Sequence, residues 1–168
     1  MGFFDSFGDN VRKKELKQQG LTLDAKLKHI SGLPIPENQI CNVYSLTEEY
    51  KFEANGLSIN LQKNKITDLS VKTNQEITKG VSSIGGAVAG GVLLGPLGAI
   101  YGGRAKNVST KTKYLVITYL KDEEVKYITF ELDGFMASVQ ATNLEYEYKR
   151  KKLKEGENPF EPKKKIDL

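Results

Sequence analysis

Residues 114–132 read YLVITYLKDEEVKYITFEL, and this stretch decides the fold class. Aromatic and β-branched residues dominate 114–120 and 125–132, and such residues favour extended strands. The charged run at 121–124 separates the two stretches, which predicts a β-hairpin with a polar turn. An isolated hairpin is at best marginally stable in water, so the rest of the chain must supply further strands and a covering element.

The chain before this hairpin carries the same strand pattern. Leu21, Leu23, Ala25 and Leu27 alternate with polar residues, and a proline-containing loop follows at 32–36. Further strands are predicted at 43–46, 50–54, 57–61 and 66–71, with a hairpin turn at 47–49 and the turn signal Asn55-Gly56 before the third of them.

Residues 3–19 predict an amphipathic helix at the beginning of the chain. Phe3, Phe7 and Val11 recur at four-residue spacing, basic residues follow, and Gly20 suits a helix end. Such a helix either lies on a membrane surface or packs against its own domain, and the sequence favours neither. In the membrane interpretation the contact residues are Phe3, Phe4, Phe7 and Val11.

A second helix is expected after Asp133-Gly134. Its apolar face is predicted to consist of Phe135, Val139 and Leu144. A lysine-rich stretch and a flexible tail from residue 153 complete the chain, and a solvated tail is the simplest interpretation of that basic charge.

The segment between the two groups of strands is rich in glycine. Residues 84–103 read IGGAVAGGVLLGPLGAIYGG, and residues 80–103, which we call the glycine insert, contain no charged residue. Glycines at four-residue spacing leave a groove on a helix that lets another backbone approach closely. Each glycine also costs a helix about 1 kcal/mol relative to alanine, so the insert needs an apolar partner to stay ordered. The expected contact residues are Gly86, Gly90, Gly91, Gly95, Pro96, Gly98 and Gly102.

The position of the glycine insert argues against a single membrane crossing. Strands on both sides of it are expected in one sheet, and one crossing would separate them. Lys79 before the insert and Arg104 and Lys106 after it favour the cytoplasmic side for both ends. A helical hairpin that turns at Gly95-Pro96 satisfies both constraints, whether it meets lipid, another subunit or its own domain. A featureless flexible loop fits less well because apolar residues fill the gaps, and a phosphate-binding loop lacks the Gly-Lys-Ser/Thr signature.

Composition narrows the class of protein. A chain of 168 residues with 39% hydrophobic and 27% charged residues fits one globular domain with appendages. The net charge of +4 is mild and acidic residues interrupt the basic stretches, so a nucleic-acid partner is not expected.

Cys41 and His29 are the only residues of their types in the sequence. They allow neither an internal disulfide nor a zinc or thiol–imidazole site within one chain, so no metal or cofactor is expected. Cys41 lies in an apolar stretch and is expected in the core. The first residues do not resemble a secretory signal, which together with the single cysteine predicts a cytoplasmic protein.

The order of short strands, a late hairpin and a closing helix resembles the bacterial pleckstrin-homology (PH) and GRAM-like families. Segments 50–52, 57–61, 65–69, 114–117 with 127–130, and the helix from Phe135 carry the resemblance. It implies an α+β fold: a PH-like antiparallel β-barrel closed by a C-terminal helix, with a glycine-rich helical hairpin inserted between middle strands. The chain is also similar to small bacterial and prophage proteins with a glycine-zipper insert, akin to SHOCT-associated PH-like proteins. The expected parts are 1–20, an amphipathic helix; 21–152, the PH/GRAM-like domain, which contains the insert at 80–103; and 153–168, a basic tail.

Two functional hypotheses follow. The first is a non-catalytic binding or scaffolding module that self-assembles as a homo-oligomer, or associates peripherally with lipid on the inner face of the cell membrane, through the glycine insert. The alternative is a small prophage-type effector or inhibitor that binds a host protein or sequesters a small ligand. An enzyme is not expected, because no pair of acids has a spacing that places it across a cleft. The acids considered are Asp68, Glu76, Asp122, Glu123 and Glu131.

Overall fold

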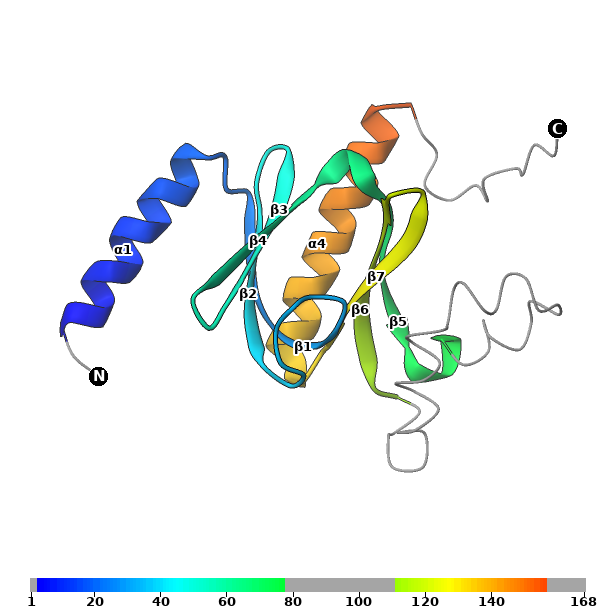
Figure 1. The fold of residues 1–168 in the computed structure, drawn as a ribbon, viewed down its shortest axis with the longest axis horizontal. Coiled ribbons are helices and arrows are strands. Elements are labelled where there is room, and N and C mark those ends of the chain that lie inside the picture. The colour runs from blue at the N-terminus through cyan, green and yellow to red at the C-terminus, as the bar shows by residue number, and fades with distance from the viewer. Residues whose placement is uncertain (1–2, 78–110, 157–168) are drawn as a thin grey trace, which may run out of the picture.

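The structure is a computed structural model that describes residues 3–77 and 111–156, with the backbone alone for residues 3–10. The described elements are α1 (Phe3–Gln18), β1 (Leu23–Ser31), β2 (Ile40–Ser45), β3 (Glu49–Ala54), β4 (Leu57–Gln62), the 3-10 turn η1 (Lys63–Lys65), β5 (Ile66–Thr73), β6 (Lys113–Lys121), β7 (Glu124–Glu131) and α4 (Gly134–Lys154) (Figure 1). The strands and both terminal helices expected from the sequence are therefore confirmed, and the glycine insert lies outside the described residues.

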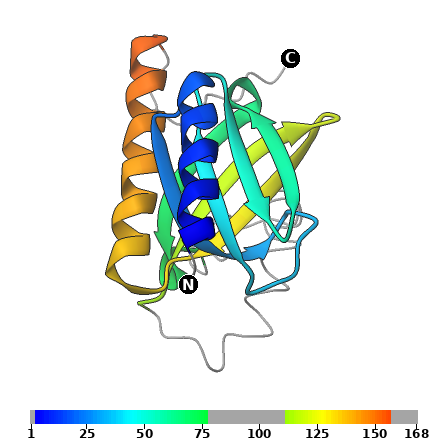
Figure 2. The same ribbon diagram turned by 90° about the vertical axis from the view of Figure 1, so that its left-hand side faces the viewer.

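The seven strands form one antiparallel sheet in the order β4-β3-β2-β1-β7-β6-β5. The sheet curves so that its two halves lie on either side of α4 in Figure 1, and α4 lies along one side of the sheet in Figure 2. The α+β class is confirmed, but the sheet is not closed into the expected barrel. The two edge strands, β4 and β5, are connected along the chain by η1. They point away from each other on either side of η1, so no backbone hydrogen-bond ladder joins them.

Two tight turns set the register of the hairpins. Asn55 and Gly56 have φ values of 50° and 76°, and Asp122 and Glu123 have φ values of 51° and 63°. Two consecutive residues with positive φ match the right-handed twist of the strands that they join. The β3–β4 hairpin uses the favourable Asn-Gly pair, whereas the β6–β7 hairpin places two acidic residues in the left-handed region.

The core lies between the curved sheet and α4. Leu27, Leu115 and Ile117 are fully buried, and the rings of Phe52 and Phe130 stack at 6.0 Å across it. Cys41 is also fully buried, as expected.

Helix α4 covers the core with a face that includes Leu144, as predicted, but neither Phe135 nor Val139. Ala141, Leu144 and Tyr148 are buried, whereas Phe135 is 80% exposed and Val139 is 36% exposed. Residues 141, 144 and 148 follow the three- and four-residue spacing of one helical face, and Phe135 lies outside that face. The apolar residues at the beginning of α4 therefore do not belong to the helical face that packs on the core.

Helix α1 projects from the sheet and is held at its C-terminal end (Figure 1). Leu16 is the buried residue in the part of α1 whose side chains are described, and Val11 is 49% exposed. Arg12 forms an ion pair with Glu53 of β3, with 3.1 Å between Nε and Oε2. Arg12 and Leu16 therefore hold the C-terminal half of α1 against the domain, although residues 11–15 remain exposed.

Candidate functional site

Both attachment points of the glycine insert lie on neighbouring strands. β5 and β6 are antiparallel partners, and Thr73 at the end of β5 pairs with Lys113 at the start of β6. The pairing continues beyond the strands, because the backbone N–H of Asn74 donates to the carbonyl of Thr112 at 2.8 Å. The chain therefore leaves and re-enters the sheet at the same place.

A capped helical turn directs the chain out of β5. Residues 74–77 are helical, and the side chain of Glu76 accepts hydrogen bonds at 2.7 Å from both the backbone N–H and the hydroxyl of Thr73. The hydroxyl of Thr73 accepts in turn from the N–H of Glu76, which completes a capping box. These hydrogen bonds from Thr73 lower the pKa of Glu76. Ile77 then packs into a small second core with Ile30, Tyr114 and Val116.

A groove of about 680 Å³ runs beside this attachment point, between the start of β6 and the start of α4. Lys111 and Lys113 lie on one side of it, and Phe135 and Val139 lie on the other. Met136, next to Phe135, is 64% exposed. The sequence pattern predicts Phe135 and Val139 in the core, so this apolar surface is not apparent from the sequence. The signal that could have found it is the buried spacing 141, 144 and 148, which leaves Phe135 and Met136 on other faces of the helix.

Three features lie toward the same vertical end of the molecule, although α1 and the attachment of the insert lie on opposite sides of the sheet in Figure 1. The N-terminal end of α1, the start of α4 and the attachment of the insert all lie toward the lower end in both Figure 1 and Figure 2. Because the two views share their vertical axis, this common height is real and not an overlap in projection.

The opposite end holds a cluster of polar residues beneath the C-terminal half of α4. Lys63 of η1 is 8% exposed, and its Nζ lies 3.0 Å from Oε1 of Glu147 and 2.8 Å from Oγ of Ser45. Ser45 donates to Glu147 at 2.6 Å, and Thr22 donates to the other carboxylate oxygen at 2.8 Å. The ammonium of Lys63 also lies 4.9 Å from the ring centroid of Tyr50.

Opposing effects act on the pKa of Glu147. Burial alone would raise this pKa, but hydrogen bonds from Ser45, Lys63 and Thr22 together lower it below the ordinary value. Burial, with the nearby charge of Glu147, also raises the pKa of the Tyr50 hydroxyl. Thr22, Ser45, Lys63 and Glu147 bond to one another and so tie η1 and β2 to α4. The buried hydroxyl of Tyr50 has no hydrogen-bond partner within the described part of the chain.

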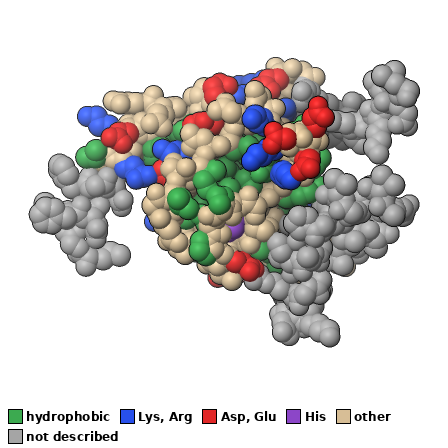
Figure 3. Space-filling model, viewed as in Figure 1, with side chains coloured by type: hydrophobic (Ala, Val, Ile, Leu, Met, Phe, Trp, Pro, Cys, Tyr) green, Lys and Arg blue, Asp and Glu red, His purple; other side chains and the backbone are tan. Residues whose placement is uncertain are grey.

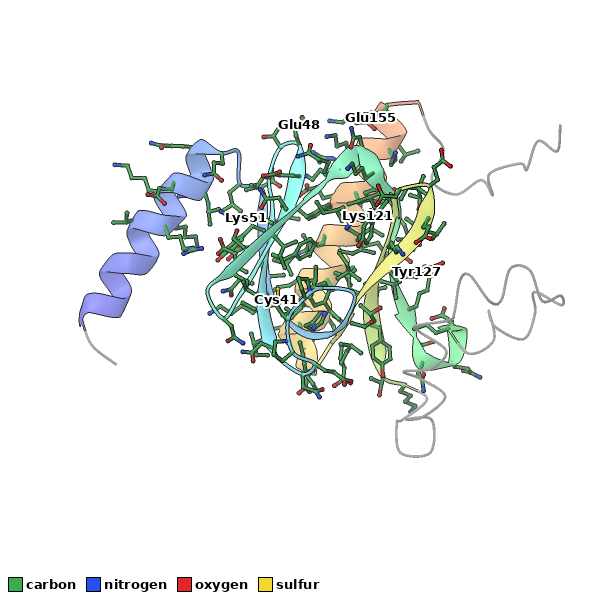
Figure 4. All side chains as sticks on the ribbon, in the orientation of Figure 1. Cys41, Glu48, Lys51, Lys121, Tyr127 and Glu155 are labelled. Carbon is green, nitrogen blue, oxygen red and sulfur yellow. The ribbon has the colours of Figure 1, made fainter. Side chains whose placement is uncertain are left out.

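A cavity of about 240 Å³ opens beside this cluster, lined by Tyr50, Lys63, Glu147 and residues of the last turns of α4. Glu48 and Glu155, which also line it, lie together at the upper end in Figure 4. Lys151 lies 3.9 Å from each of these two carboxylates. The lining carries charged side chains of both signs, so the cavity lies in no field of a single sign. Charges of both signs also mix in the upper half of the face in Figure 3.

The acids considered from the sequence lie on separate elements, except for the neighbours Asp122 and Glu123. Asp68 on β5 accepts from Ser70 at 2.8 Å, Glu131 on β7 pairs with Lys28 at 2.5 Å, and Asp122 and Glu123 form the β6–β7 turn. Within residues 3–77 and 111–156, no group of three or more His, Cys, Asp or Glu side chains is placed to hold a metal ion.

The predicted contact residues of the glycine insert, Gly86 to Gly102, lie outside the described residues, as do the side chains of Phe3, Phe4 and Phe7. Val11 is described and exposed. Among the helices in the described part of the chain, none is long and apolar enough to span a membrane. In comparisons with known proteins, no family model matches the chain, and no curated protein matches it significantly.

Proposed function

We propose that this protein is a non-catalytic, PH-like binding module that associates peripherally with a membrane through its glycine insert. The insert enters one leaflet as a helical hairpin that turns at Gly95-Pro96. The sheet domain stays on the side from which both arms enter. Lys79, Arg104 and Lys106 favour the cytoplasmic face of the cell membrane for that side.

The pairing of Thr73 with Lys113 carries this proposal. Two strands that are antiparallel neighbours end at the same place, so an apolar segment between them needs no crossing of the bilayer. A hairpin with arms of about ten residues reaches about 15 Å, which is half of the hydrocarbon thickness. The domain can therefore remain whole while the insert is buried in lipid.

Burial in lipid also meets the physical requirement of the glycine insert. Its sequence has no charge to solvate, and burying apolar surface contributes about 25 cal/mol per Å². Close packing between two glycine-lined arms supplies the helix–helix contact that glycine permits.

The fold supports the PH-like part of the proposal. An antiparallel seven-stranded sheet that curves around a C-terminal helix agrees with the α+β class that the resemblance implies, although this sheet is open between β4 and β5 and is not the expected closed barrel. The resemblance further implies a module that holds a lipid headgroup, peptide or protein.

Flotation with vesicles of phosphatidylcholine and phosphatidylglycerol tests the proposal. Wild type should float, and Leu94→Asp should lower its partition about a hundredfold, because a charge in the bilayer core costs about 2.5–3.5 kcal/mol. Leu120→Asp is the matched control, since Leu120 is 44% exposed at the far end of β6 and its change should leave flotation intact. Wild type that stays at the bottom of the gradient would refute the proposal.

Self-assembly through the insert is the competing use of the same glycines. Replacing both Gly90 and Gly95 by leucine separates the two. Loss of flotation with an unchanged mass by light scattering supports the membrane role. A change of oligomeric state without vesicles supports a homo-oligomer instead.

A further inference from the structure

The first turns of α4 carry an apolar surface that faces away from the core. Phe135, Met136 and Val139 are 80%, 64% and 36% exposed. Successive residues of an α-helix are rotated by about 100° around its axis. These three residues therefore lie on the side of α4 roughly opposite to the buried residues Ala141 and Leu144. No movement of the α4 side chains alone can bury this trio against the sheet that α4 covers.

The position of the trio links it to the glycine insert. Phe135 and Val139 line the same groove as Lys111 and Thr112, and Lys111 is the first described residue after the insert. The backbone at Thr112 is also bonded to Asn74, where the chain leaves β5. The apolar surface therefore lies beside the place where the chain leaves β5 and returns to β6.

The charges around the groove suit an anionic surface. Lys111 and Lys113 are exposed on its β6 side. The lining also holds two acids, Asp133 and Glu131, and the carboxylate of Glu131 is paired with Lys28 at 2.5 Å. Exposed aromatic and aliphatic side chains flanked by lysines are the combination that binds at the boundary of headgroups and acyl chains.

We infer that the start of α4 is a second bilayer contact, in which Phe135 and Met136 enter the interfacial region of an anionic membrane while Lys111 and Lys113 lie at the level of the phosphates. This inference rests on the proposed function, because the insert brings the groove to the membrane. The contact fixes the orientation of the domain on the bilayer, which a hairpin anchor alone leaves free to rotate.

Flotation of the full chain tests this contact separately from the insert. The double substitution Phe135→Ser and Met136→Ser removes exposed apolar surface, and we expect its partition into vesicles with 30% phosphatidylglycerol to fall about tenfold or more. Leu153→Ser is the matched control, because Leu153 is 52% exposed on the same helix, about 27 Å away along the axis. The control should float as wild type does.

A fluorescent label gives an independent measurement. An environment-sensitive dye on Phe135→Cys should shift to shorter wavelength on adding vesicles, whereas the same dye on Leu153→Cys should not. Cys41 is fully buried, so the introduced thiol is the one labelled in the folded protein.

The outcomes separate the two proposals. If wild type floats but the double variant floats equally well and the label at position 135 does not shift, the second contact is refuted and the insert anchor stands. If wild type does not float, the proposed function fails and the second contact falls with it. A shift at position 135 that appears on raising protein concentration without vesicles assigns the surface to a second copy of the chain and overturns the lipid contact.

Discussion

Lys63 Nζ lies 3.0 Å from Oε1 of Glu147, and this ion pair joins the turn between the two edge strands to the helix that covers the core. The lysine is 8% exposed and the glutamate 23% exposed, so water screens the pair only in part. Because β4 and β5 do not pair with each other, the contact of η1 with α4 holds the open side of the sheet in place.

Lys63→Met should lower the free energy of unfolding by about 2 kcal/mol. The substitution leaves the partly buried carboxylate of Glu147 without its cation, and the cost is smaller than for a fully buried pair because Glu147 keeps some water contact. Urea unfolding measures it. Lys126→Met is the control, since its pair with Glu124 is exposed to solvent at the start of β7 and should contribute nothing measurable.

The same carboxylate should make stability depend on pH. The pKa of Glu147 is lower in the folded protein than its ordinary value of 4.5, so folding favours the charged form. Its contribution is fully present above the unfolded pKa and is lost as pH falls through the folded pKa. The urea midpoint of wild type should therefore drop below about pH 4.5 more steeply than that of Glu147→Gln. Equal slopes for the two proteins would contradict the assignment.

The sequence could predict the hairpins but not this ion pair. Alternating apolar residues and the Asn55-Gly56 turn are local signals, and local signals place strands. Lys63 and Glu147 are 84 residues apart, and each reads by itself as a solvated charge. The prediction that Phe135 lies on the buried face of α4 was wrong for a related reason. Phe135 fits the helical spacing, but only the position of the sheet decides which apolar side of the helix is covered.

Gly32 occupies a position where a side chain cannot fit. Its φ is +96°, and a Cβ there would run into the carbonyl of Tyr127 on the neighbouring strand β7. Gly32→Ala should therefore cost more than 2 kcal/mol, roughly the backbone penalty plus the displacement of β7. Gly56→Ala isolates the backbone penalty, because Gly56 has a φ of +76° with open space around it, and should cost about 1 kcal/mol. Thermal unfolding of both variants measures the difference, and equal losses would show that β7 does not confine position 32.

Cys41 should resist thiol reagents in the folded protein. It is fully buried, and burial raises the pKa of its thiol to about 11, so the reactive thiolate is scarce at pH 8. Ellman's reagent should react slowly in buffer and immediately in concentrated urea. Fast reaction in buffer would mean that β2 opens readily from the core.

Replacing residues 80–103 by a short glycine-serine linker should leave the sheet domain folded. The attachment residues Thr73 and Lys113 are register partners, and Ile77 anchors the outgoing turn in its own apolar cluster. A shorter loop also closes at a smaller entropic cost, by about 0.6 kcal/mol for each halving of its length. The free energy of unfolding in urea should therefore stay equal to that of wild type or rise slightly, while flotation with vesicles is lost. A variant that keeps its strands by circular dichroism but unfolds at much lower urea would mean that the insert covers part of the sheet. In that case the apolar partner that the insert requires is the domain itself, and the membrane role would have to be abandoned.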